Sequence, residues 1–231
     1  MSTREAFLGT VRAHLGTPAP ANMPHPLEPV EGVPLVHYAR DLSDVEGTFV
    51  ERARRTGAVV RRVADDTGLA ALVGEVVREE GIGRAVVSAD PECDAVADML
   101  AEAGVSVVAF GDPSNSGADG RVDVAEVAAA QLGVTGAAYG IAATGTLVLH
   151  SGRAGGRSAG LLPPVHLGLV RSSNILPEAG ALFRRLDDRL PDGLPSQLVL
   201  SSGPSRSGDI ELVITIGVHG PGRVWVGVLD W

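Results

Sequence analysis

Three loop segments carry the side chains of this sequence that are best suited to chemistry. In Thr144-Gly145-Thr146 the hydroxyls can bind an anion or a carbonyl group, and the glycine allows a close approach to the backbone. Ser207 and Asp209 can cap a helical turn whose free amides bind an anion, and Asp209 can also act as a base. His219, in a turn rich in Gly and Pro, can serve as acid, base or hydrogen-bond donor. The alternative for the Thr144 segment is a plain hairpin turn. For Ser207 and Asp209 it is simple capping, and for His219 it is a structural histidine.

A long stretch without acidic residues surrounds the first of these segments. From Val127 to Pro177 the chain has no Asp or Glu, so the local field should be positive and favour an anionic ligand. The arginines and histidines of this stretch are His150, Arg153, Arg157, His166 and Arg171. We expect an anion beside the Thr144 turn, with Arg153 or Arg157 as its counter-charge. The alternative is a stretch of buried strands, in which carboxylates are rare and His166 is a strand residue.

The residue types that are missing exclude several classes of protein. The single cysteine, Cys93, cannot form an intrachain disulfide, a thiolate zinc site or a self-contained iron–sulfur cluster. Cys93 follows Pro91-Glu92 at an expected helix start, which can lower a thiol pKa, but a free cysteine is more often a buried, inert thiol. The chain has no lysine, which removes Schiff-base chemistry and the P-loop lysine. A GxGxxG fingerprint and an HExxH motif are also absent. We therefore expect no bound metal, flavin or cluster.

Size and composition are those of one large α/β domain. The chain has 231 residues, 45% of them hydrophobic and only 3% aromatic, so its core should be aliphatic. No apolar run reaches the ~18 residues of a transmembrane helix, and the N-terminus lacks the apolar core of a signal peptide, so we expect a cytoplasmic protein. The net charge of −9 argues against nonspecific nucleic-acid binding.

Residues 1–34 are expected to form a helix and an arm ahead of the main domain. Ser2 can cap a helix that runs to about Leu15, with Glu5 at the capping-box position. Residues 17–34 contain six prolines, which predict an extended arm. This helix and arm can wrap a neighbouring subunit, as in a homo-oligomer, or the surface of the same domain; a loosely attached tail is the alternative. The main domain is expected over residues 35–231.

The main domain begins with alternating helix and strand signals. Ser43 or Asp44 can begin a helix, and Gly81 and Gly104 can end two others. This β-α-β rhythm predicts a mostly parallel sheet with helices on its faces. The elements expected here are strands at 58–63, 84–88 and 105–110, and helices at 44–56, 66–80, 91–103 and 122–132, with a polar loop at 111–120.

After Gly133 strand signals dominate. Thr144-Gly145 lies between two apolar segments like the turn of a hairpin. Segments 211–217 and 223–229 are expected to pair as a C-terminal β-hairpin around His219. The remaining expected elements are apolar strands at 134–142 and 146–149, a Gly/Arg loop at 152–160, strands at 165–170 and 197–201, a helix from Pro177 to about Leu190 and a loop at 202–208.

Four segments, in this order and spacing, resemble the lactate-utilization (LUD) family and, within it, the group of C components. They are Gly140–Leu149, Leu161–His166, Ser207–Glu211 and Gly217–Pro221. The resemblance implies an α/β fold of the NagB/RpiA/CoA-transferase-like superfamily, with a mostly parallel central sheet, flanking helices and a C-terminal β-hairpin. The family commonly places a glutamate just before the Thr-Gly-Thr triplet. This chain has Ala143 there, so any chemistry of that carboxylate would be lost.

The resemblance also implies a cluster-free component of a system that oxidises L-lactate to pyruvate, whose partners carry iron–sulfur motifs. Such a component would bind a partner protein, a small anionic metabolite or both, at the C-terminal ends of the strands. The alternatives are a stand-alone enzyme of the CoA-transferase or sugar-phosphate-isomerase type and an interaction protein without ligand chemistry. The absence of lysine and the presence of Ala143 argue against the enzyme interpretation. The arginines of the acid-free stretch argue against an interaction protein without ligand chemistry.

Overall fold

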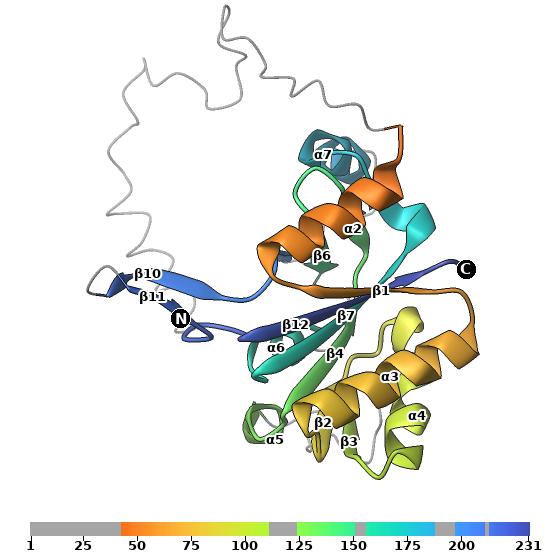
Figure 1. Ribbon diagram of the computed structural model, residues 1–231, viewed down its shortest axis with the longest axis vertical. Coiled ribbons are helices and arrows are strands. Elements are labelled where there is room, and N and C mark those ends of the chain that lie inside the picture. The colour runs from red at the N-terminus through yellow and green to blue at the C-terminus, as the bar shows by residue number, and fades with distance from the viewer. Residues whose placement is uncertain (1–42, 111–123, 151–155, 188–196, 211–212) are drawn as a thin grey trace, which may run out of the picture. The chain divides into compact units, whose positions relative to one another are not determined.

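A six-stranded parallel sheet, with strand order β1-β12-β7-β4-β2-β3, organises the protein (Figure 1). The structure is a computed structural model that describes residues 43–110, 124–150, 156–187, 197–210 and 213–231. The helix expected at 2–15, the arm at 17–34 and the loop at 111–120 lie outside these residues. The mostly parallel sheet flanked by helices is confirmed.

Two smaller sheets accompany the main one. A four-stranded sheet has the order β8-β5-β6-β9, and β10 pairs with β11 alone. The strands are β1 (Val59–Val63), β2 (Arg84–Val87), β3 (Ser106–Ala109), β4 (Leu132–Gly136), β5 (Tyr139–Ile141), β6 (Thr146–His150), β7 (Val165–Arg171), β8 (Ile175–Leu176), β9 (Leu198–Ser201), β10 (Arg206–Ile210), β11 (Val213–Ile216) and β12 (Arg223–Leu229).

Local signals explain where the first helices begin and end. Asp44 caps α2, with its Oδ1 accepting a hydrogen bond of 2.7 Å from the amide of Gly47, and Asp65 caps α3 in the same way. Gly57 and Gly81 end these helices in left-handed conformations. The described helices are α2 (Val45–Thr56), α3 (Asp66–Glu80), α4 (Val96–Glu102), α5 (Val124–Ala128), α6 (Gly156–Leu161) and α7 (Ala179–Asp187), with 3-10 turns η1 (Pro91–Cys93) and η3 (Ser172–Asn174). None of these described helices is long and apolar enough to cross a membrane.

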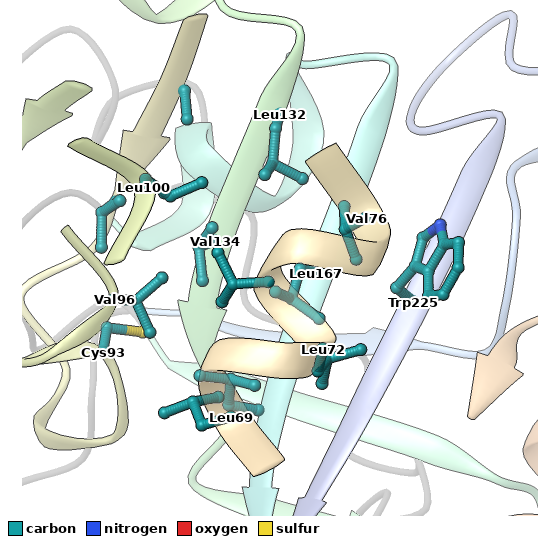
Figure 2. Packing of buried hydrophobic residues seen from close by; sticks show 14 of the residues in the cluster. Leu69, Leu72, Val76, Cys93, Val96, Leu100, Leu132, Val134, Leu167 and Trp225 are labelled. Atoms are coloured by element: carbon teal, nitrogen blue, oxygen red, sulfur yellow. The ribbon is translucent and has the colours of Figure 1, made fainter. Parts of the chain in front are cut away.

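Apolar side chains bury both faces of the main sheet. On one face α3 and α4 pack their leucines and valines against Leu132, Leu167 and Trp225 (Figure 2). On the other face α2 and the four-stranded sheet cover Val60 and the valines of β12, while α5 and α6 cover β2 and β3. Helix α7 packs on the far side of the four-stranded sheet. The core is aliphatic apart from Trp225, Phe49 and Tyr139, as the composition predicted.

The expected pairing of the last two strand segments is wrong. Strand β12 lies between β1 and β7 in the middle of the main sheet, and β11 pairs with β10. A C-terminal hairpin is therefore present, but β10 and β11 form it. The run Val224–Leu229 is buried on both faces, which is the pattern of a central parallel strand.

Three other expectations change in detail. The loop expected at 152–160 contains α6, because close packing on β4 and β7 offsets the low helix propensity of its glycines. The segment 134–142 is divided between β4 and β5, which belong to different sheets. The helix expected from Pro91 begins as the 3-10 turn η1 and continues as α4 only from Val96.

Candidate functional site

A cavity of about 200 Å³ lies at the carboxyl ends of the main-sheet strands. Asp90 and Glu92 line it just after β2, Gly136 lines it at the end of β4, and Asn174 lines it after β7. Tyr139 and His150 of the second sheet and Arg185 of α7 complete its wall. Open parallel sheets bind their ligands at this edge. We call this cavity the carboxylate pocket.

Hydrogen bonds fix the acidic side of the pocket. Asp90 is 8% exposed, and its Oδ2 accepts hydrogen bonds from Ser88 Oγ at 2.5 Å and from the amide of Gly136 at 3.1 Å. Glu92 is nearly buried, and its Oε1 lies 2.9 Å from Nε of Arg171 at the end of β7. Two carboxylates from one loop are thus held by groups at the ends of β2, β4 and β7.

The absence of a side chain at Gly136 makes room for both carboxylates. A Cβ at this position would lie 2.5 Å from Cβ of Asp90 and 2.6 Å from Oε2 of Glu92. Real Cβ atoms do not come this close to other heavy atoms. The end of β4 therefore presents bare backbone to the acidic side of the pocket.

The opposite side of the pocket is cationic and aromatic. The guanidinium of Arg185 lies over the ring of Tyr139, 5.6 Å from its centroid. No ion pair to Arg185 is formed by the side chains that the structure describes. His150 and Asn174 add groups that can donate or accept hydrogen bonds. The pocket therefore offers acceptors on one side and donors on the other.

Comparison with known proteins assigns the family. Residues 47–229 match the LUD domain, and this range contains every strand of the main sheet. The chain belongs to the LUD-domain family. The protein YkgG of Escherichia coli (strain K12) is 31% identical over 236 residues, which cover 96% of this chain and 95% of YkgG. A protein named lactate utilization protein C from Halalkalibacterium halodurans is 40% identical over 103 residues, which cover 44% of this chain and 45% of that protein.

Structural comparison agrees on the fold. The crystal structure of a DUF162 family protein from Deinococcus radiodurans superimposes with a TM-score of 0.54. The match covers 81% of this chain and 97% of that chain at 23% sequence identity. At this identity the likeness concerns the arrangement of the LUD domain's helices and strands.

The Thr144 turn lies at the other end of the β5–β6 hairpin from the carboxylate pocket. Gly145 has φ +65°, and a Cβ there would overlap the backbone nitrogen of Ala53 in α2. Its close approach is thus to a helix of the same LUD domain. Thr144 and Thr146 share a hydrogen bond of 2.6 Å, and Thr146 is 2.7 Å from Oγ of Ser202. The loop after β9 therefore lies beside the Thr144 turn.

Replacing Thr146 by valine is expected to destabilise the LUD domain by about 1 kcal/mol. The hydroxyl of Thr146 is buried and bonded to two other hydroxyls, and valine has the same shape without either bond. The free energy of unfolding in urea measures the loss. Thr146→Ser keeps the hydroxyl and is the matched control; equal losses in the two variants would show that the hydrogen bonds contribute nothing.

The structure places Ser207, Asp209 and His219 in segments away from the pocket. Ser207 and Asp209 lie in strand β10, with Ser207 opposite Thr215, so the expected helical turn capped by Asp209 is wrong. The chain reverses between β10 and β11, so Asp209 and His219 do not lie at the two ends of one straight strand. His219 is exposed in the turn before β12, at the amino end of the main sheet.

Arg153 lies outside the described residues, and Arg157 is described only as part of α6. An anion at the Thr144 turn stays a prediction.

Two titratable side chains are deeply buried. His166 is fully buried in β7, where Nε2 lies 2.8 Å from Oγ1 of Thr135 and burial lowers its pKa to about 4. The hydrogen-bond partner of His166 is thus the side chain of Thr135. Cys93 is buried in the core, which confirms the expected burial, and this burial raises the pKa of its thiol. In the described part of the chain, no three His, Cys, Asp or Glu side chains are grouped to hold a metal ion.

Most residues of the pocket are not among the candidates expected from the sequence. Asp90, Tyr139, Asn174 and Arg185 belong to this group, and the sequence gives Glu92 a place only as a neighbour of Cys93. A signal was available for Asp90 and Asn174, because both lie within a few residues after predicted strands of a parallel sheet. Tyr139 and Arg185 belong to the second sheet and to α7, whose position over the pocket depends on long-range packing.

Proposed function

We propose that this protein is a component of an L-lactate utilization system and serves the oxidation of L-lactate to pyruvate. The observation that carries the proposal is the LUD domain over residues 47–229, together with the similarity to proteins named lactate utilization protein C. The alignments with those named proteins from Halalkalibacterium halodurans and Geobacillus span 45% and 62% of their lengths, whereas YkgG aligns over 95% of its own.

The electrons of the reaction are proposed to pass to a partner. Conversion of L-lactate to pyruvate releases two electrons and two protons, and an iron–sulfur protein can accept the electrons. One cysteine cannot ligate a cluster, so the clusters would belong to a partner subunit. The β10–β11 hairpin is a suitable contact, because Ile216 and Val218 at its base are 58% and 45% exposed beside His219.

A stand-alone enzyme is the second candidate. The specific observation in its favour is the convergence of Asp90 and Glu92 on the backbone of Gly136. Paired carboxylates in different environments can divide the roles of acid and base in proton transfer. In an isomerase-type reaction, this pair would move a proton on a substrate in the pocket without any partner.

Deleting the gene in a strain without other L-lactate dehydrogenases is expected to abolish growth on L-lactate and to leave growth on pyruvate unchanged. Reintroducing the full chain should restore growth, and a tagged full chain should co-purify with a protein that contains iron. Growth of the deletion strain on L-lactate at the parental rate would contradict the proposal. Turnover of a sugar phosphate or an acyl-CoA by the purified chain alone would favour the second candidate.

A further inference from the structure

One side of the carboxylate pocket is lined by polar side chains that have no hydrogen-bond partner among the described residues. They are Tyr139 of β5, Asn174 of η3 and Arg185 of α7. We propose that this side of the pocket binds the oxyanion group, a carboxylate or a phosphate, of a small ligand. The choice of L-lactate and pyruvate as the first ligands to test rests on the proposed function.

The hydroxyl of Tyr139 is the observation that points to a ligand. The side chain of Tyr139 is only 9% exposed, because its ring packs in a cluster with Leu176 of β8 and Leu182 of α7. No described residue forms a hydrogen bond with this hydroxyl, whereas the hydroxyl of a buried tyrosine usually has a partner. Tyr139 lines the pocket, so a group of the ligand can accept the hydrogen bond.

The guanidinium of Arg185 supplies the positive charge at the same place. It lies over the ring of Tyr139, 5.6 Å from the ring centroid, and forms no ion pair with a described carboxylate. Contact with the face of a ring leaves the N–H donors of a guanidinium available for a carboxylate or a phosphate, which it can bind through two parallel hydrogen bonds.

Asn174 adds a third donor from another part of the chain. It lies in η3 between β7 and β8, is half-buried, and its side-chain amide has no hydrogen bond to a described group. The amide of an asparagine, a tyrosine hydroxyl and a guanidinium can all donate hydrogen bonds. An oxyanion accepts several hydrogen bonds at once, so it is the group that these three donors satisfy best.

The acidic side of the pocket is satisfied within the protein. Glu92 forms an ion pair with Arg171 at 2.9 Å, and Asp90 accepts a hydrogen bond from the amide of Gly136 and has further partners. Neither carboxylate therefore needs the ligand as a partner. Both repel an anion placed next to them, which directs the oxyanion of the ligand towards Arg185.

The size of the pocket restricts the rest of the ligand. A volume of about 200 Å³ is below the range of roughly 300–1,000 Å³ that drug-sized ligands occupy. A short carboxylic acid or a small phosphate is small enough to be enclosed. A dinucleotide or an intact coenzyme A is not.

Calorimetry on the full chain tests the proposal with matched pairs of ligands at one ionic strength. L-lactate is compared with L-lactamide and pyruvate with pyruvamide, because each amide keeps the shape of the acid and lacks its charge. Inorganic phosphate is titrated separately, so the two arms distinguish a carboxylate from a phosphate ligand. In the carboxylate arm the acid should bind about tenfold or more tightly than its amide, which is the effect of one hydrogen bond to a charged group. Binding of phosphate alone would assign the site to phosphates.

Two variants test the uncharged donors. Tyr139→Phe keeps the ring beneath Arg185 and removes only the hydroxyl, so it should weaken the anion about tenfold. Without ligand it should unfold at the same urea concentration as wild type, because the hydroxyl has no described partner to lose. Asn174→Asp keeps the shape of the side chain and replaces its donors by a negative charge, so it should weaken the anion by tenfold or more.

A third variant tests the cation against a matched control. Arg185→Gln, on an exposed side chain, should weaken every anion about tenfold and leave the weak binding of the amides unchanged. Arg184→Gln lies on the same helix, but Arg184 pairs with Glu178 and does not line the pocket. It should therefore bind the anion as wild type does.

The contrary outcomes are equally specific. Equal affinities for each acid and its amide, without binding of phosphate, would overturn the oxyanion assignment. Wild-type affinity in Tyr139→Phe or in Arg185→Gln would overturn the role of that side chain, and equal losses in Arg185→Gln and Arg184→Gln would mean that only the general charge of α7 matters. If no tested anion bound below 10 mM (roughly the limit of a useful weak site), the pocket assignment would be wrong. The proposed function would then still be judged separately by growth on L-lactate.

Discussion

Replacing Gly133 by alanine is expected to destabilise the protein by about 3 kcal/mol or more, which is the upper range for overpacking a core. A Cβ at Gly133 would overlap the carbonyl oxygen of Ala159 in α6 and would lie 3.1 Å from Cγ of Pro163. The first contact is with backbone, which cannot turn away as a side chain can. Strand β4 cannot retreat either, because it is hydrogen-bonded to β2 on one side and to β7 on the other. Urea unfolding followed by circular dichroism measures the loss.

Gly208 provides the matched control for this substitution. It also lies in a strand, β10, but a Cβ there would meet nothing within 4 Å, so Gly208→Ala should change the free energy of unfolding by less than about 0.5 kcal/mol. A loss below about 1 kcal/mol in Gly133→Ala would mean that α6 does not press on β4 as described.

The first half of the main domain was predictable because its signals are local. Asp65 and Gly81 mark the two ends of α3 by capping, and the strands on either side of this helix are short apolar runs between polar turns. Each of these signals lies within a few residues of the element it defines. The structure accordingly reproduces β1, α3, β2 and β3 close to the expected ranges.

The position of β12 depends on contacts that local signals do not report. Its sequence predicts a strand but does not indicate that β1 and β7 are its neighbours, because both strands lie far earlier in the chain. Gly227 shows how close this packing is, because a Cβ there would lie 2.8 Å from Leu169 and 2.9 Å from Leu72. Helix α6 is a similar case, since its glycines predict a loop, whereas its close packing on β4 brings the carbonyl of Ala159 against Gly133.

The same division between local and long-range contacts explains the candidate site. The sequence pointed to the edge of the sheet at which the pocket lies, because ligand sites follow the carboxyl ends of parallel strands. It did not indicate which polar residues meet there, since Asp90 and Arg185 are brought together by two different sheets and α7. The Thr144 segment was noticed for its residue types, but its described hydroxyl contacts are to Thr146 and then to Ser202.

His166 should make the protein sensitive to acid. The imidazole is fully buried between β4 and α6, and no described group contacts its Nδ1 by a hydrogen bond. Its pKa in the folded protein is about 4, below the value of about 6.5 of an exposed histidine, because burial disfavours the charged form. The folded state therefore holds a neutral imidazole over a pH range in which the unfolded chain binds a proton.

The unfolded chain therefore binds this proton more readily than the folded protein does. The contribution of His166 to the free energy of unfolding is fully present above pH 6.5 and is lost as the pH falls towards 4. The loss due to this residue is about 2 kcal/mol at pH 5 and about 3 kcal/mol at pH 4. His166→Gln can keep a hydrogen bond to Thr135 but does not titrate, so its unfolding free energy should fall less steeply in this range. Urea unfolding at pH 7, 6, 5 and 4 for both proteins isolates the difference, since all carboxylates are common to the two. Parallel curves for His166→Gln and wild type between pH 7 and pH 5 would show that the imidazole is not held neutral by burial.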